Sequence, residues 1–368
     1  MIYKPWVRKE LLIGKLAQFG LPDSFLNFLH SFLAAREGYV IVENARSIAM
    51  TLSNMVYEGT VLGPPLWNSF FADVVQVTQG NQQANLFADD LTIDTHCRAG
   101  ASNDLLRNEL AEIQSRTHRW GKLNQVTFDP AKEHICIVHP SEGIGDDFRM
   151  LGTLLDCKLT MRPCIDKILA KARPKIRAIL KMKHLFPVAE LINQYKTHIW
   201  GFAEYSNGSV IMATPSQLKR LDKMQRGFLH ALHLSDTDAF IHHNFAPPSL
   251  RRRIGLLGFL HKRVLHACHP FIVQCFPAAQ FTGYRIHSRA LATFIGEVRH
   301  HWPLYFRSIY VYISAYNVLP QSFADLPTVK QFQIALTKSV KVLAQTSDPS
   351  WRDAFCDHGN VLRLFHDL

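Results

Sequence analysis

Two short apolar segments, residues 86–88 and 91–93, flank the adjacent acids Asp89 and Asp90. Each segment has the length of a short strand, and Asp tolerates unusual turn dihedrals, so we predict a tight hairpin with both carboxylates at its tip. Adjacent carboxylates repel each other unless a cation lies between them. An isolated Asp-Asp pair is most often an exposed turn, so its meaning depends on the rest of the chain.

Composition narrows the class of protein. The chain has 368 residues, of which 47% are hydrophobic and 19% charged, which excludes a disordered or collagen-like chain and suggests two or three domains. Its seven cysteines are odd in number and irregularly spaced, as is typical of reduced intracellular thiols. The N-terminus has no apolar signal-peptide core, and the longest apolar stretch, 309–319, is too short to span a membrane. We expect an intracellular protein, nuclear or cytoplasmic, with no membrane association.

The net charge of +11 is unevenly distributed. Residues 1–158 contain 14 Lys and Arg against 18 Asp and Glu, whereas residues 159–263 contain 18 against 6 and residues 264–368 contain 9 against 6. An acidic first part followed by a strongly basic block indicates a carboxylate site and a surface for a polyanion, of which nucleic acid is the obvious example. The alternative for the basic block is a solvated helical face.

Helical periodicity is clearest at the start of the basic block. From residue 165 the apolar residues recur at helical spacing, and Pro174 is expected to kink or divide the helix. The remaining faces of this helix contain the cations Lys167, Lys171, Arg173, Lys175, Arg177 and Lys181. Near the N-terminus, two further helices are predicted within residues 10–33, on either side of a break at 20–23.

Three further motifs accompany the Asp-Asp pair in a fixed order. Before it, the turn-rich segment 58–64 (EGTVLGP) leads into an apolar helix over 66–75. After it, the segment 128–132 (FDPAK) ends at Lys132, and a Leu-Gly pair follows at Leu151 and Gly152.

This order of motifs resembles the reverse transcriptases of non-LTR (LINE-type) retrotransposons, over residues 10 to about 260. The resemblance implies an α+β fold, in which a partial polymerase palm, an antiparallel sheet with packed helices, precedes an all-α thumb and a helical C-terminal region. It implies a palm over 1–158, a basic helical thumb over 159–263, and a region of unknown role over 264–368.

The resemblance also implies roles for individual residues, in RNA-templated DNA synthesis by two-metal nucleotidyl transfer. Asp89 and Asp90 are expected to hold Mg²⁺ or Mn²⁺, for which carboxylate oxygens are suitable ligands. Lys132 is expected to protonate the leaving pyrophosphate. Template and incoming nucleotide are expected to contact Glu58, Gly59 and Phe87. The primer is expected to contact Leu151 and Gly152. The nucleic-acid backbone is expected to contact the six cations of the basic helix. The implied partners are an RNA template, a DNA primer and dNTPs.

The sequence also departs from the family pattern. The family's first catalytic Asp precedes a helix that resembles residues 9–20, yet residues 1–8 contain no acid, and the fingers would lie further upstream. Neither Asp73 nor Asp94 is well placed to substitute, and Glu58 stands where the family usually has Gln. We therefore expect an N-terminally truncated polymerase with impaired activity. The alternatives are a non-catalytic remnant that binds nucleic acid and a translated relic without function.

Three other groups of residues have less specific meanings. Cys268 and Cys275, with His261, His266 and His269, lack the tight Cys pair of a structural zinc site. The run 251–253 (RRR) is short for a nuclear-import or phosphate-binding patch. The aromatic residues between 302 and 316 are expected to pack in a core, with base stacking as the alternative.

Overall fold

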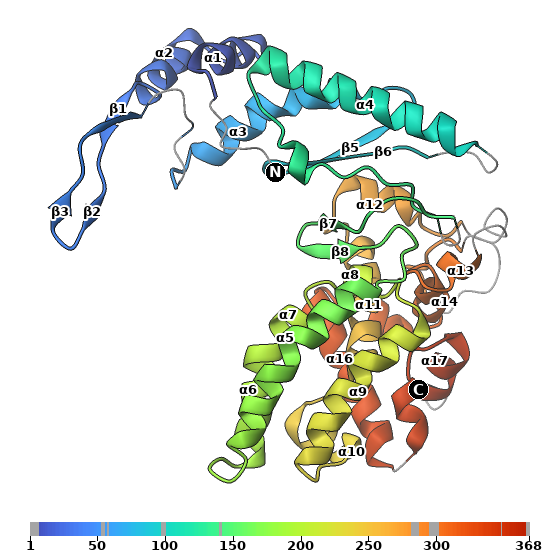
Figure 1. The fold of residues 1–368 in the computed structure, drawn as a ribbon. Helices are drawn as coiled ribbons and strands as arrows, with labels where there is room; N and C mark the ends of the chain where they lie inside the picture. The colour runs from blue at the N-terminus through green and yellow to red at the C-terminus, as the bar shows by residue number, and fades with distance from the viewer. Residues whose placement is uncertain are drawn as a thin grey trace. The chain divides into compact units, whose positions relative to one another are not determined.

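The computed structural model describes residues 7–52, 56, 59–96, 101–139, 142–280, 287–293, 302–346 and 348–365 (Figure 1). It divides into two compact units, Met1–Ile137 and Val138–Leu368. Helices predominate, and the strands form four separate two-stranded antiparallel sheets in the described part of the chain. The predicted α+β class is confirmed at this level.

The first unit combines four helical segments with three strand pairings. Its helices are α1 (Lys9–Gln18), α2 (Asp23–Phe32), α3 (Gly63–Phe71) and α4 (Asn103–Asn124), with the 3₁₀ turns η1 (Ala72–Val77) and η2 (Pro130–Lys132). Its strands are β1 (Arg36–Gly38), β2 (Ile41–Val42), β3 (Ala45–Arg46), β4 (Met50–Leu52), β5 (Gln83–Phe87) and β6 (Asp90–Asp94). The pairings are β1 with β4, β2 with β3, and β5 with β6. The two helices predicted within residues 10–33 are confirmed as α1 and α2.

The core of the first unit forms where α1, α3 and α4 meet. Leu12, Phe70 and Phe71 are almost fully buried there, and Trp120 packs edge-on against Phe71 with ring centroids 5.4 Å apart. Burying a side chain as large as Phe contributes about 1.5–3 kcal/mol. This core therefore fixes α3, the helix that precedes the aspartate hairpin.

The second unit is a hairpin followed by helices. Its strands are β7 (Phe148–Met150) and β8 (Thr153–Leu155). Its longer helices are α5 (Arg162–Lys181), α6 (Val188–Tyr195), α9 (Pro215–Ala231), α10 (Asp236–His243), α11 (Pro248–Val264) and α16 (Val329–Gln345). Its short helical segments are η3 (Lys196–Trp200), α7 (Gly201–Ala203), α8 (Asn207–Val210), α12 (Pro270–Cys275), α13 (Trp302–Tyr305), α14 (Val311–Asn317), α15 (Gln321–Ala324), η5 (Pro349–Asp353) and α17 (His358–Leu364).

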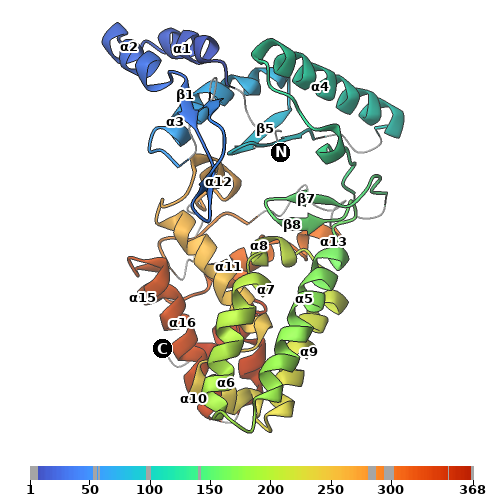
Figure 2. The same ribbon diagram turned by 60° about the vertical axis from the view of Figure 1, so that its left-hand side comes forward.

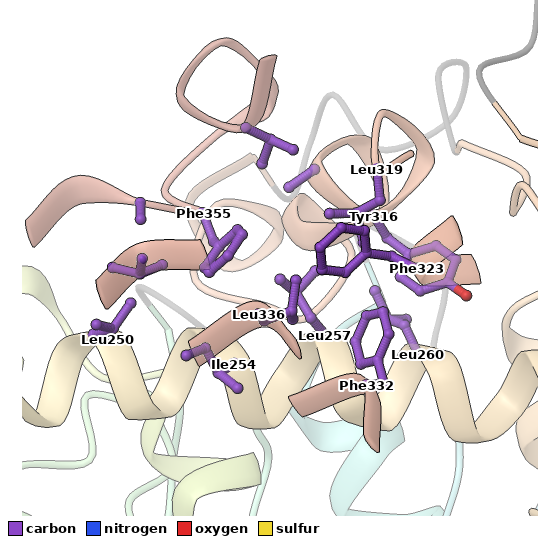
Figure 3. Packing of buried hydrophobic residues seen from close by; sticks show 14 of the residues in the cluster. Leu250, Ile254, Leu257, Leu260, Tyr316, Leu319, Phe323, Phe332, Leu336 and Phe355 are labelled. Atoms are coloured by element: carbon purple, nitrogen blue, oxygen red, sulfur yellow. The ribbon is translucent and has the colours of Figure 1, made fainter. Parts of the chain in front are cut away.

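Two hydrophobic clusters hold the second unit together, and α10 contributes to both, with Ala239 in the first and Phe240 in the second. The first joins α5, α6 and α9, and the second joins α11 to the helices that follow it. Figure 3 shows Leu250, Ile254 and Leu257 in a row along α11, facing aromatic side chains from later in the chain. Residues 159–263 and 264–368 therefore belong to one compact unit.

Tyr316 of α14 lies fully buried in the second of these clusters, where Tyr310 and Tyr312 pack against it. The expected core packing is confirmed for these three aromatic residues. Phe306 differs from them, because 62% of its surface is exposed.

The basic helix α5 runs without a break from Arg162 to Lys181, so the expected division at Pro174 is wrong. Proline removes the donor to the carbonyl oxygen four residues earlier, here that of Ala170. Both residues are exposed, so water can hydrate this carbonyl group.

Among the helices of the described residues, none is both long and apolar enough to cross a membrane.

Candidate functional site

The aspartate hairpin consists of β5 and β6, whose last ladder pair is Phe87 with Asp90. The two-residue turn is therefore Ala88-Asp89, one position earlier than predicted, and only Asp89 lies in it. Asp90 begins strand β6. Ala88 has a φ of +54°, which is the left-handed region that favours glycine and that both primed hairpin turns require at their first turn residue.

The hairpin is fixed to the first unit by its turn and by one face. The indole Nε1 of Trp67, in α3, donates a hydrogen bond of 2.8 Å to the carbonyl oxygen of Ala88. Leu91 and Ile93 of β6 pack against the core. Side chains alternate across a strand, so Phe87 and Asp90, which form one ladder pair, share the opposite face. The ring of Phe87 is 65% exposed there.

The carboxylates near this hairpin have different environments. Asp89 and Asp90 are both half-buried. Asp94, at the end of β6, accepts a hydrogen bond of 2.8 Å from the Asn85 side chain. In the part of the chain that the structure describes, no three His, Cys, Asp or Glu side chains come together as a metal-binding group.

Asp73 is held in a structural ion pair. Its Oδ1 lies 2.7 Å from Nζ of Lys15 and accepts a hydrogen bond of 3.1 Å from Nε1 of Trp120. The ammonium group of Lys15 also lies 4.4 Å from the centre of the Phe70 ring. Burial lowers the pKa of Lys15, although Asp73 opposes the shift. The contacts of Asp73 connect α1, η1 and α4.

Two carboxylates on consecutive residues suit one hard cation whose remaining ligands are water or phosphate oxygens. They do not by themselves supply the bridging carboxylates of a two-metal centre.

Lys132 and Gly59, two further residues expected to contact substrate, lie in turns of the first unit. Lys132 ends the turn η2, where its Nζ lies 3.5 Å from Oδ2 of Asp129. Gly59 has a φ of +77°, a conformation that favours glycine, and a Cβ there would meet open space. Glu58 lies outside the described residues.

Leu151 and Gly152 form the turn of the β7–β8 hairpin in the second unit, with φ values of +45° and +83°. The hydroxyl group of Tyr205 donates a hydrogen bond of 3.1 Å to the carbonyl oxygen of Leu151. Next to this turn, the side-chain oxygens of Thr153 and Ser206 lie 2.8 Å apart. The Leu-Gly turn is thus fixed to the loop that follows α7.

Helix α5 buries its large apolar residues on one face and exposes its cations on the other. Ile165, Leu169 and Ala172 are among the residues that bury its inner face in the core. The six cations predicted to contact nucleic acid are all exposed: Lys167, Lys171, Arg173, Lys175, Arg177 and Lys181. Lys171 also lies over the ring of Phe202, 4.5 Å from its centre.

Helix α9 adds cations that the sequence analysis did not assign. It lies beside α5 (Figure 2), and Arg220 of α9 forms an ion pair of 2.6 Å with Asp166 of α5. Lys219, Lys223 and Arg226 of α9 are exposed. The helical spacing of Lys219, Lys223 and Arg226 is the signal that would have identified these cations as one exposed face.

The three arginines at 251–253 point inward. Arg251 bonds Glu204 and lies over the Trp200 ring, while Arg252 is 6% exposed and lies 3.2 Å from Asp222. Arg253 donates hydrogen bonds to the carbonyl oxygens of Arg352 and Ala354. These contacts leave little of the run exposed, which adds to its short length as a reason against an import or phosphate-binding patch.

Comparisons with protein-family models, with curated proteins and with solved structures found no match. The fold and these sites define an α+β protein with a half-buried Asp-Asp hairpin in its first unit and an exposed cationic helix pair in its second.

Proposed function

We propose that this chain binds nucleic acid through the exposed cations of α5 and α9, as a protein derived from a non-LTR retrotransposon reverse transcriptase. The observation that carries the proposal is that all six α5 cations are exposed beside a second helix with exposed cations. On a solvated helix, acids at i±3 or i±4 stabilise exposed cations, whereas like charges at this spacing destabilise the helix. Between residues 167 and 189 this chain contains no acid at all.

Phosphate contacts of this kind give affinity without sequence choice. Each neutralised phosphate releases counterions, so the logarithm of the affinity falls linearly with the logarithm of the salt concentration. For B-form DNA the slope is about −0.9 per phosphate contact, so removing three contacting cations is expected to reduce it by about 3.

The test measures the affinity of the full chain for a fluorescent duplex by anisotropy, over a range of salt concentrations. The variant replaces Arg173, Lys175 and Arg177 by Gln, and all three side chains are exposed. The matched control replaces Lys262, Lys330 and Lys338, three exposed lysines of α11 and α16 in the same unit. We expect a smaller slope in the α5 variant only. Equal slopes in the two triple variants, or no measurable binding, would contradict the proposal.

A second candidate function is RNA-templated DNA synthesis at the aspartate hairpin. The observation in its favour is that Asp89 lies in a tight turn with Phe87 exposed on the adjoining strand face. In this proposal Asp89 and Asp90 hold Mg²⁺ or Mn²⁺, which neutralises phosphate charge, and Lys132 donates a proton to the leaving group. The substrates are an RNA template, a DNA primer and dNTPs. Gly59 is their proposed backbone contact in the first unit.

Primer extension on an RNA template tests this second candidate. Asp89→Asn should abolish the product and also weaken Mn²⁺ binding measured by electron paramagnetic resonance. Asp104→Asn is the control, because Asp104 is an acid of the same unit with a 90% exposed side chain. Equal product from the wild type and from Asp89→Asn would rule out this chemistry.

A further inference from the structure

The turn between α5 and α6 exposes two large apolar side chains at the end of the basic helix. Leu185 is 67% exposed and Phe186 is 45% exposed. Neighbouring apolar residues of α5 and α6, such as Ile179 and Leu191, are almost completely buried. The two side chains therefore differ from the apolar residues on either side of them.

The backbone holds this pair in a defined position. The amide groups of Leu185 and Phe186 both donate to the carbonyl oxygen of Met182, at 2.9 Å and 3.3 Å. Pro187 follows at once and precedes the first turn of α6, with a φ of −66°. A hydrogen-bonded turn followed by proline loses little conformational entropy when it contacts a partner.

The surroundings of the pair are cationic. Lys181, Lys183 and His184 are exposed beside it. The first acid that follows, Glu190, is half-buried and accepts a hydrogen bond of 3.1 Å from Gln194. The charge around the exposed pair is therefore complementary to a polyanion.

We propose that Leu185 and Phe186 form an apolar wedge that stacks on an unpaired or unstacked base of the nucleic acid bound along α5. This inference rests on the proposed nucleic-acid binding. Apolar wedges between basic side chains are used in this way by proteins that unstack a base step, and an aromatic ring can stack on any base. The wedge gives the protein a preference for bulges and for junctions between single and double strands, whereas the α5 cations bind every nucleic acid.

An anionic membrane surface fits these observations less well. Interfacial helices insert a continuous apolar face into the lipid headgroup region. The apolar face of α5, which includes Ile168, Leu169 and Ile176, is instead buried in the core of the second unit. Two side chains at a turn suffice to stack on a base but present little area to a bilayer.

The experiment compares the full chain and its Phe186→Ala variant on two DNA duplexes, one continuous and one with a bulged 2-aminopurine. Phe271→Ala is the matched control, because Phe271 of the same unit is 46% exposed. Stacking on one base corresponds to about 1–3 kcal/mol, and we expect the wild type to prefer the bulge by about tenfold. Phe186→Ala should remove the preference and restore 2-aminopurine fluorescence without changing the salt slope. Phe186→Trp should recover both.

The possible outcomes distinguish the wedge from the proposed binding of nucleic acid by α5. If Phe186→Ala retains the preference, or Phe271→Ala removes it equally, the wedge is overturned while binding by α5 stands. If the chain binds neither duplex, both proposals fail. If Phe186→Ala loses binding only to phosphatidylserine vesicles, the pair is a membrane contact and the proposal is overturned.

Discussion

The indole nitrogen of Trp67 donates a 2.8 Å hydrogen bond to the carbonyl oxygen of Ala88. This bond connects α3 to the turn that contains Asp89, across 21 residues of sequence. The ring of Trp67 is itself stacked on Phe71, with centroids 5.1 Å apart. The position of the aspartate turn therefore depends on the packing of α3 as well as on the hairpin.

Trp67→Phe tests this connection. The substitution keeps an aromatic ring to stack on Phe71 but removes the donor to Ala88. One lost hydrogen bond at this exposed site should reduce the free energy of unfolding by about 0.5–1 kcal/mol. Urea unfolding of the two proteins measures the difference. An unchanged midpoint would show that this bond does not stabilise the hairpin.

Ala88→Gly is expected to stabilise the first unit. A non-glycine residue at a φ of +54° pays a steric cost of about 1–2 kcal/mol, which glycine avoids at a smaller entropic cost. We expect a net gain of up to about 1 kcal/mol in thermal unfolding. The control is Ala84→Gly, within strand β5, which should destabilise the protein because glycine weakens a strand interior. Two shifts of the same sign would contradict the steric explanation.

Asp156→Ala should destabilise the second unit. Asp156 is 9% exposed, and its carboxylate accepts hydrogen bonds from the amide groups of Thr160 and Met161, at 2.9 Å and 2.7 Å. Removing this carboxylate takes away the hydrogen-bond acceptor of two amide groups at the start of α5. The free energy of unfolding should therefore fall by about 1–3 kcal/mol. Asp156→Asn retains one acceptor oxygen and should lose less. Chemical denaturation ranks the three proteins, and equal loss in both variants would contradict this interpretation.

Stability should fall on mild acidification because of His261. Its Nε2 lies 2.8 Å from the carbonyl oxygen of Leu326 and its Nδ1 lies 3.1 Å from the Tyr316 hydroxyl group. Burial lowers the pKa of His261 below its usual value of about 6.5. Above that value the imidazole is neutral in the folded and unfolded states, so His261 adds no pH dependence there.

As the pH falls below about 6.5, the unfolded state takes up the proton first, and stability decreases by up to about 1.4 kcal/mol per pH unit until the folded state also titrates. His261→Gln should remove this part of the slope. Urea midpoints of both proteins between pH 7.5 and 5 measure it. Parallel curves for wild type and variant would show that another group is responsible.

Local sequence patterns predicted the elements whose residues are close in the chain. The helical spacing from residue 165 predicted both the buried face of α5 and the exposure of its six cations, because side chains three and four residues apart share one face. The break at 20–23 predicted the separation of α1 from α2 in the same way. The helix is not divided at Pro174, because the hydrogen bond lost there lies on the exposed side of α5, where water can replace the donor.

Long-range contacts decided which arginines are buried and where the aspartate turn lies. The run 251–253 is cationic in sequence, yet its side chains are drawn inward by partners such as Glu204, Asp222 and the Arg352 carbonyl group, 30 to about 100 residues away. The turn at Ala88-Asp89 is set by the packing of Leu91 and Ile93 and by the bond from Trp67. A one-residue shift in register would move every side chain to the other face of the hairpin.

The sequence by itself determined which helices form and which of their faces are cationic, because periodicity is a property of neighbouring residues. Only the tertiary structure decided which charges remain in contact with water. Burial depends on groups brought together from distant parts of the chain, and no local pattern encodes that. Exposed Arg173 and buried Arg252 are the same residue type, distinguished only by what packs around them.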